Sequence, residues 1–132
     1  MSQLAEDVGA EPVFAGLGAG HMARFVIDTL KRIQALVLLG EVRISLHGYD
    51  ELAADEIPVR DVIAGLSQAT IVEDYPTYGK GPCVLVLQRD SEGQPVHVVW
   101  GIVFGRTTPA VLVTAYRPDP RKWDESWRRR RT

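Results

Sequence analysis

The sequence predicts a single α+β domain in which N-terminal helices pack on a four-stranded antiparallel sheet and a short C-terminal helix follows. Two observations support this fold class. In the first half of the chain, apolar residues recur every three or four positions, as they do in amphipathic helices. After residue 69 they form four β-branched runs separated by turn residues, as in a meander of strands. Helices followed by such a meander indicate a sheet with helices on one face.

Length and composition are those of one globular domain. The chain has 132 residues, of which 45% are hydrophobic, so it can bury a core without disulfides or metals. Residues 1–20 are rich in alanine and glycine and show no sustained period, so we expect a flexible leader. We expect residues 21–127 to form the domain and residues 128–132 to be a basic tail. The single cysteine, Cys83, lies in an apolar run, and we expect it to be buried and unreactive.

Three helices and one extended segment are expected before the sheet. Residues 21–39 have an apolar stripe at helical spacing, and Gly40 follows as a residue that ends helices in the left-handed conformation. Residues 42–47 alternate apolar and polar side chains, which indicates a half-buried strand or an extended entry segment. Residues 49–55 are expected to form a short helix. A further helix is expected to start at Pro58, because proline fits the first helical turn.

Four strands are expected in the second half, at residues 70–73, 83–89, 96–104 and 110–117. The segments between them have the length of hairpin connections and contain glycine or proline. Pro118 and Pro120 end the last strand, because proline cannot donate to the ladder. Trp123 and Trp127 then lie four residues apart, which predicts that a short C-terminal helix packs them onto the sheet.

The charge distribution limits the surface that could bind nucleic acid. The formal net charge is −2, but residues 117–132 contain seven basic and three acidic side chains. Nucleic-acid-binding proteins usually present a net basic surface, which only this C-terminal segment offers. The most hydrophobic stretch, residues 25–39, is interrupted by charged residues, and the N-terminus is acidic where a secretory signal would be basic. We therefore expect a cytoplasmic protein that makes no membrane contact.

Five motifs follow one another in an order that is similar to a bacterial family. They are HGYDEL at 47–52, IPVRDV at 57–62, EDYP at 73–76, PVHVVWG at 95–101 and VTAYRPD at 113–119. With them the chain resembles the family catalogued as domain of unknown function 4258, over about residues 42–123. That family has no established reaction. Its outline is similar to the RelE-like toxin and barnase-type ribonuclease fold, so the resemblance implies a toxin-type, metal-independent ribonuclease or an inactive relative of one.

His47 is the first candidate for chemistry. It ends the extended segment just before Gly48 and a helix, where a side chain is often presented at a rim. Imidazole exchanges protons near neutral pH, and Glu51 lies one helical turn further on, where it can orient the ring. The structural alternative is a histidine that hydrogen-bonds backbone at the start of the helix.

His97 lies in an apolar strand and shares a face with Val99, Gly101 and Val103. Such a histidine is either a satisfied core residue or lines a cleft, and taken alone the core interpretation is favoured. If His97 met His47, the two would supply the general base and the general acid of metal-independent RNA cleavage.

Tyr116 and Arg117 end the last strand on opposite faces, so both enter one cleft only if the strand end twists or bulges. The Arg117 guanidinium is suited to bind phosphate, and the structural alternative is an ion pair with Asp119 or Glu73. Tyr116 is a candidate for stacking on a base.

Two further residues are candidates for substrate binding. Tyr75 can stack on a base, and it belongs to a polar rim that Tyr78 and Lys80 continue in the next loop. The alternative for this loop is plain turn chemistry. Arg60 can steady a phosphate, although an arginine in such a helix is more often a solvated face residue.

The chain lacks several motifs that define other chemistry. It has no glycine-rich phosphate loop followed by lysine, no Gly-x-Ser-x-Gly turn and no His/Cys pair at metal spacing, so we expect no cofactor. His47, Glu51 and His97 can in principle hold a metal, which we do not expect.

Two functions remain open on this basis. The first is the toxin-type ribonuclease, with RNA as its substrate and an antitoxin-like protein as its partner. The second is a non-catalytic protein-binding or assembly module, in which the helix at 21–39 and the tryptophan helix contact other proteins. A homodimer is compatible with either.

Overall fold

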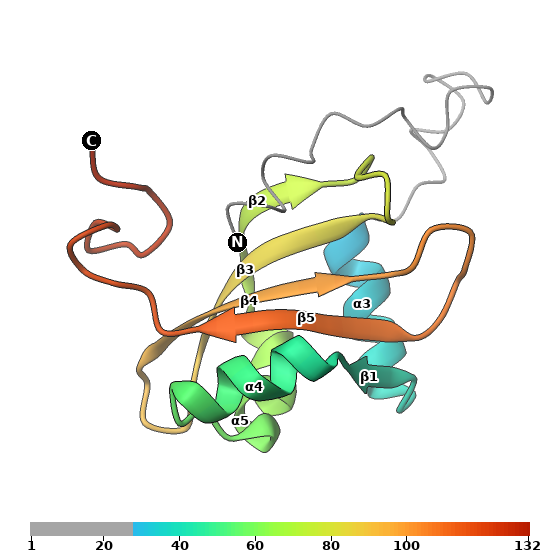
Figure 1. Cartoon of the computed structure of the whole chain (residues 1–132), viewed down its shortest axis with the longest axis horizontal. Helices are drawn as coiled ribbons and strands as arrows, with labels where there is room; N and C mark the ends of the chain where they lie inside the picture. The colour runs from blue at the N-terminus through green and yellow to red at the C-terminus, as the bar shows by residue number, and fades with distance from the viewer. Residues whose placement is uncertain (1–27) are drawn as a thin grey trace.

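The computed structural model describes residues 28–132 (Figure 1). The expected leader and the first part of the helix expected at residues 21–39 lie outside the described residues. The predicted α+β class is confirmed: within residues 28–132, three α-helices pack with a sheet of five strands. None of the helices in this part of the chain is long and apolar enough to cross a membrane.

The sheet consists of β1 (Val42–Ile44), β2 (Thr70–Tyr75), β3 (Cys83–Arg89), β4 (Pro95–Gly101) and β5 (Ala110–Tyr116). The strands lie in the order β1-β5-β4-β3-β2. From β2 to β5 all pairs are antiparallel, as predicted. However, β1 pairs parallel with β5, with Val42 opposite Ala110, so the expected four-stranded antiparallel sheet is in fact five-stranded and mixed. The physical reason is that β5 would otherwise leave an open edge, which the short alternating segment covers.

Helix α3 (Thr29–Leu38) has well-defined caps at both ends. The Asp28 carboxylate accepts a hydrogen bond from the Lys31 N–H at 2.9 Å. At the other end Gly40 has a φ of 77°, and the N–H groups of Gly40 and Glu41 donate to the Val37 and Leu36 carbonyls. The predicted end of this helix at Gly40 is therefore confirmed.

Helices α4 (Leu46–Ala54) and α5 (Val59–Gly65) follow β1, and a 3-10 turn at Leu66–Gln68 leads into β2. Helix α5 begins directly after Pro58, as predicted. Helix α4 begins three residues earlier than predicted, because the Ser45 hydroxyl accepts the Gly48 N–H at 2.9 Å and caps the helix. His47 is therefore part of the first helical turn and does not end a strand.

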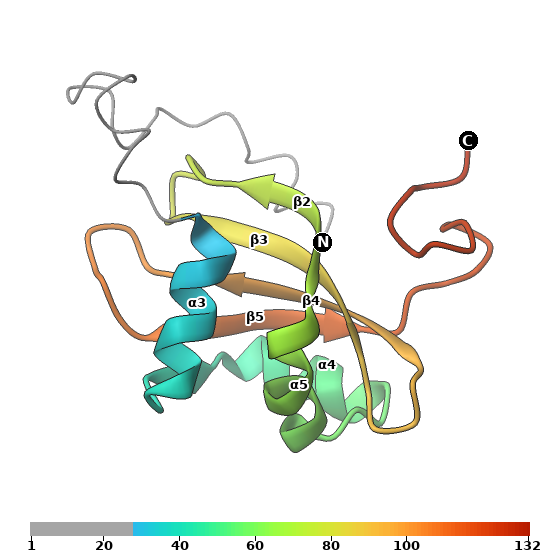
Figure 2. The ribbon, with the colours of Figure 1, turned by 180° about the vertical axis from the view of Figure 1, so that it is seen from behind.

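One face of the sheet is covered by helices. Figure 2 shows α3 and α5 in front of this face, and both figures show α4 along the β5 edge. Trp100 is fully buried in this layer, together with Val98 and Leu112. The buried Gln88 accepts the Trp100 Nε1–H at 3.0 Å and donates to the Val62 carbonyl at 2.8 Å, so its amide is satisfied without water.

The other face bears Cys83, Leu85, Val99 and Val113, and we call it the helix-free face. The segment after β5, residues 118–132, folds back on part of it, and we call this segment the C-terminal loop. The expected C-terminal helix is wrong: Trp123 pairs with Arg130 in an isolated bridge, and Trp127 has a φ of 62° that a helix cannot contain. The expected packing of Trp123 on the sheet is confirmed, since its exposure is 5%.

Candidate functional site

The helix-free face has two halves, one covered by the C-terminal loop and one hollow. His97 lies under the loop and is fully buried. Its Nε2 atom lies 2.6 Å from the Trp127 carbonyl oxygen, and its Nδ1 atom lies 3.1 Å from the Tyr116 hydroxyl. A carbonyl can only accept, so Nε2 carries the proton, and Nδ1 of the neutral ring accepts from Tyr116. Trp123 packs edge-on against the imidazole, with ring centroids 4.5 Å apart.

Burial holds both members of this pair in their neutral forms. It lowers the pKa of His97 below its usual range, and the Trp127 carbonyl opposes that shift only in part. It also raises the pKa of Tyr116 to about 12. His97 is thus a satisfied core histidine in this arrangement, with both ring nitrogens occupied by the chain itself.

His47 lies apart from His97, and the structure does not bring the two histidines together. The His47 side chain is 64% exposed, and its Nε2 atom lies 3.6 Å from Glu51 Oε1, one helical turn away. The expected proximity of Glu51 to His47 is therefore present. The remaining ring nitrogen of His47 is free to face solvent or a ligand.

Two contacts hold the start of α4 against β5. The Ser45 hydroxyl donates to the Val113 carbonyl at 2.9 Å. Gly48 has no side chain at the point of closest approach, where a Cβ would lie 2.9 Å from the Leu112 carbonyl oxygen. His47 is consequently held beside β5, because it lies two residues after Ser45, whose hydroxyl binds the Val113 carbonyl of that strand.

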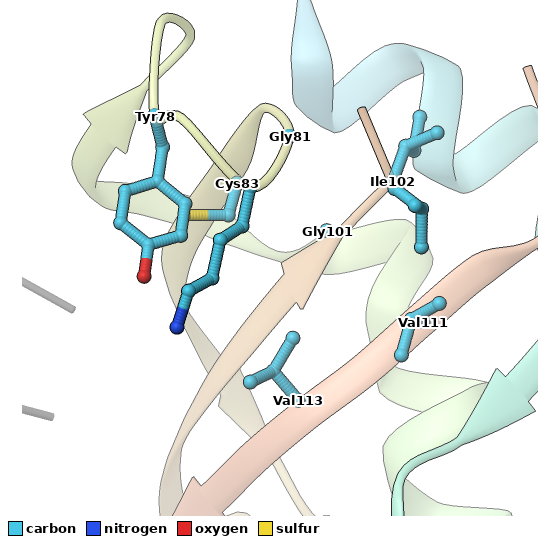
Figure 3. A pocket seen from close by; sticks show the side chains of 9 residues that line it. Tyr78, Gly81, Cys83, Gly101, Ile102, Val111 and Val113 are labelled. Carbon is cyan, nitrogen blue, oxygen red and sulfur yellow. The ribbon is translucent and has the colours of Figure 1, made fainter. Parts of the chain in front are cut away.

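The hollow half of the helix-free face contains a cavity of about 230 Å³. Figure 3 shows Tyr78 and Cys83 on one side of it, Val111 and Val113 on the other, and Gly101 between them. The remaining lining residues are Lys80, Gly81, Ile102 and Val103. The sequence predicted that Tyr78 belongs to a polar rim, but the cavity itself was not predicted. The available signal was Gly101, since a glycine inside a strand often marks a place where a ligand approaches the backbone.

One basic side chain lines this cavity, and a second lies on the same face of the sheet. Lys80 is exposed on its lining, and the nine lining residues include no acidic one. Arg43 is exposed and lies opposite Val111 in the β1–β5 register, so it shares the helix-free face. Neither side chain has a hydrogen bond or ion pair within residues 28–132. The cavity therefore has on its lining a lysine that is unpaired in this part of the chain, whereas the Asp74 carboxylate is close enough to Cys83 to contribute to the raised pKa of the thiol.

Arg117 makes structural contacts at the end of β5. Its Nη1 atom lies 3.0 Å from Asp90 Oδ2, and its backbone N–H donates to Asp55 Oδ2 at 2.8 Å. The expected ion-pair partners are used elsewhere: Asp119 pairs with Arg121, and Glu73 with Arg130.

Neither Tyr75 nor Arg60 is among the residues that line the cavity, although Tyr75 lies opposite Cys83 in the β2–β3 register. Tyr75 donates its hydroxyl to Glu73 at 2.6 Å, and burial together with this bond raises the pKa of Tyr75. Arg60 is exposed on α5, in the helical layer. Cys83 is buried as expected, and burial raises the pKa of its thiol to about 12. Among the described residues, no group of three His, Cys, Asp or Glu side chains is arranged to hold a metal ion.

Fold and site together define an α+β domain with a mostly apolar hollow, lined in part by Lys80, on the helix-free face of its sheet. The family described as Domain of unknown function (DUF4258) matches residues 44–117, more than half of the chain, and the chain belongs to this family. No curated protein and no solved structure matches it. The matched segment contains both histidines of the candidate site and ends at Arg117, so the C-terminal loop lies outside it.

Proposed function

We propose that this protein is a toxin-type, metal-independent ribonuclease whose reacting group is the His47 imidazole. The supporting observation is the exposed pair of His47 and Glu51, anchored through Ser45 to the same strand that forms one wall of the cavity. The RelE-like and barnase-type outline that the family resemblance implies is part of this proposal.

The chemistry follows from the position of the two side chains. Glu51 faces Nε2 of His47, so Nδ1 is the atom that takes the proton from a ribose 2′-hydroxyl. The 2′-oxygen then forms a bond to the adjacent phosphorus, and the bond from phosphorus to the 5′-oxygen breaks. Water protonates the leaving 5′-oxygen. The products are a 2′,3′-cyclic phosphate and a 5′-hydroxyl, and Glu51 stabilises the imidazolium that forms.

To Arg43 and Lys80, which have no acidic ion-pair partner in residues 28–132, we assign the role of binding the phosphate backbone of the RNA. Charge from such side chains offsets the negative charge that develops on the phosphate oxygens. In this proposal His97, Tyr116 and Arg117 support the fold: His97 and Tyr116 hold the C-terminal loop, and Arg117 fixes the end of β5.

The test compares the wild type with His47→Ala and Glu51→Gln, and uses Arg60→Ala in the helical layer as the matched control. Each variant is expressed in cells for growth and RNA integrity, and each purified protein is incubated with RNA in the presence of EDTA. We expect wild type and Arg60→Ala to cleave RNA, His47→Ala to be inactive, and Glu51→Gln to be slower. Intact RNA with the wild type, or equal cleavage by His47→Ala, would refute the proposal.

A second candidate function, assembly into a homodimer, is favoured by one surface. Leu38, Leu39 and Leu46 are 87%, 76% and 79% exposed, and in sequence they flank the edge strand β1. Each copy offers the same leucines and the same open strand edge, which suits a symmetric contact with a second copy. The molar mass by light scattering should then be that of a dimer and fall to the monomer value in Leu38→Lys. A monomeric wild type at high concentration would refute assembly.

A further inference from the structure

We propose, on the basis of the ribonuclease function above, that the cavity beside Gly101 holds one base of the RNA and that Lys80 holds its phosphate. Four features of the cavity support this assignment: a fixed wall, a limited size, an apolar lining and one lysine on that lining.

The wall of the cavity is fixed by backbone contacts. Gly81 has a φ of 127°, and a Cβ there would lie 1.9 Å from the Ile102 carbonyl oxygen, so the loop before β3 touches the chain that leaves β4. The Ile102 N–H donates to the Pro82 carbonyl, and the Phe104 N–H donates to the Lys80 carbonyl, both at 3.0 Å. Lys80 is therefore held beside the cavity before any ligand binds.

The size of the cavity selects a small planar group. Its volume of about 230 Å³ lies below the range of about 300–1,000 Å³ that is typical of pockets for drug-sized ligands. Gly101 lines the floor, and a Cβ there would already lie 3.3 Å from Cys83 Cβ. One ring system fits such a space, whereas the rest of an RNA chain must run across the open face.

The chemistry of the lining matches a base that bears a phosphate. The walls are apolar or aromatic, formed by Cys83, Val111 and Val113 with the ring of Tyr78. Single-stranded RNA is commonly bound by such surfaces together with basic residues that contact the backbone. Lys80 on the lining and Arg43 on the same face supply that charge.

The lining contains few groups that could read a base edge. The Gly81 N–H is bound to the Tyr78 carbonyl, and the Ile102 N–H is bound to the Pro82 carbonyl. Since sequence is read through hydrogen bonds to base edges, we expect the cavity to accept all four bases with dissociation constants within about tenfold of one another.

The test is an NMR titration of the purified full chain with mononucleotides, which have no internucleotide bond that a ribonuclease could cleave. The probes are the four 5′-nucleoside monophosphates, adenosine without phosphate, and inorganic phosphate alone. We expect shifts centred on Gly101, Val111 and Lys80 with each nucleotide, weaker binding of adenosine, and no shift at Gly101 with inorganic phosphate.

Two further variants test the two halves of the assignment. Lys80→Ala should weaken nucleotide binding at least fivefold but leave adenosine binding unchanged, whereas the matched control Lys122→Ala should change neither. Val113→Phe fills the cavity and should abolish adenosine binding, with folding checked by circular dichroism. Absence of shifts at Gly101 with every nucleotide, or equal binding by the Lys80→Ala variant and its parent, would overturn the proposal.

The outcomes separate this proposal from the ribonuclease function. If nucleotides bind at Gly101 but the wild type leaves RNA intact, the ribonuclease proposal is refuted and the base-site proposal is supported. If RNA cleavage depends on His47 but no chemical shift changes at Gly101, the ribonuclease proposal is supported and the base-site proposal is refuted.

Discussion

The Nε2 atom of His97 lies 2.6 Å from the carbonyl oxygen of Trp127, thirty residues further along the chain. This bond joins the family segment, which ends at Arg117, to the C-terminal loop that follows it. The Arg130 guanidinium strengthens the same junction, because it lies 3.3 Å from Glu73 and 4.9 Å from the centre of the Trp123 ring. A neutral, buried histidine is therefore part of what keeps the loop on the sheet.

The free energy of unfolding should depend on the pH through His97. Its pKa is lowered in the folded protein, whereas the unfolded chain has the ordinary value of 6.5. Below pH 6.5 the unfolded chain therefore binds more protons, so this contribution to stability is present above pH 6.5 and is lost as the pH falls below it. We expect urea denaturation between pH 8 and pH 5 to show this loss.

The control for this prediction is a pair of variants. His97→Phe should show a smaller loss of stability between pH 6.5 and pH 5 than the wild type, and Arg60→Ala, on the exposed surface of α5, should behave like the wild type. A pH dependence that is unchanged in His97→Phe would show that other groups cause it.

Trp123 is expected to be the main anchor of the C-terminal loop. It is 5% exposed and packs with Leu85 and Val99, so Trp123→Ala leaves a cavity on the helix-free face. Such a truncation typically costs about 3–5 kcal/mol. Chemical denaturation should detect the loss, and Trp127→Ala should cost less because Trp127 is only half-buried. Equal costs for the two variants would contradict the arrangement of the loop.

Gly48→Ala should destabilise the protein, although it lies inside a helix. A glycine-to-alanine change in an exposed helix interior normally stabilises by about 1 kcal/mol. At this position the new Cβ would lie 2.9 Å from the Leu112 carbonyl oxygen, which is backbone and cannot move aside. The melting temperature should therefore fall. The control is Ala53→Gly on the exposed side of the same helix, which should lower it only by the ordinary helix penalty.

The contact between Arg117 and Asp90 is expected to be the more important of two ion pairs near the end of β5. The Asp90 side chain is 3% exposed, and the backbone N–H groups of Gln94 and Glu92 together with Arg117 outweigh the effect of burial and lower its pKa. Asp90→Asn should therefore lower the melting temperature more than Asp119→Asn, which removes the exposed pair with Arg121. The reverse order would contradict this.

Much of the fold could be predicted because its signals are local. The end of α3 at Gly40, the start of α5 after Pro58 and the positions of the four antiparallel strands all depend on neighbours within a few residues. The early start of α4 also had a local signal, because Ser45 is a preferred N-cap residue. The alternating pattern of residues 42–47 favoured an extended segment instead, so this signal was not used.

The candidate site was predicted only in part. Glu51 was placed beside His47 correctly, because a separation of four residues in a helix brings side chains together. Whether His47 meets His97, which the sequence left open, depended on two elements far apart in sequence, and the structure gives the two histidines different partners. The cavity was missed because its lining comes from three separate segments, residues 78–83, 101–103 and 111–113, that no single periodicity connects.

By itself, the sequence determined the α+β class, the caps and turns, and which residues along each strand share a face, because these follow from short-range sterics and side-chain periodicity. Only the tertiary structure decided that β1 joins β5 in parallel, that the segment with Trp123 and Trp127 forms a loop in place of a helix, and that His97 is buried while His47 is exposed. Those outcomes depend on contacts such as the bond from Ser45 to Val113, 68 residues apart. Competing edges and faces of the folded sheet select among such partners, and that competition exists only once the chain has collapsed.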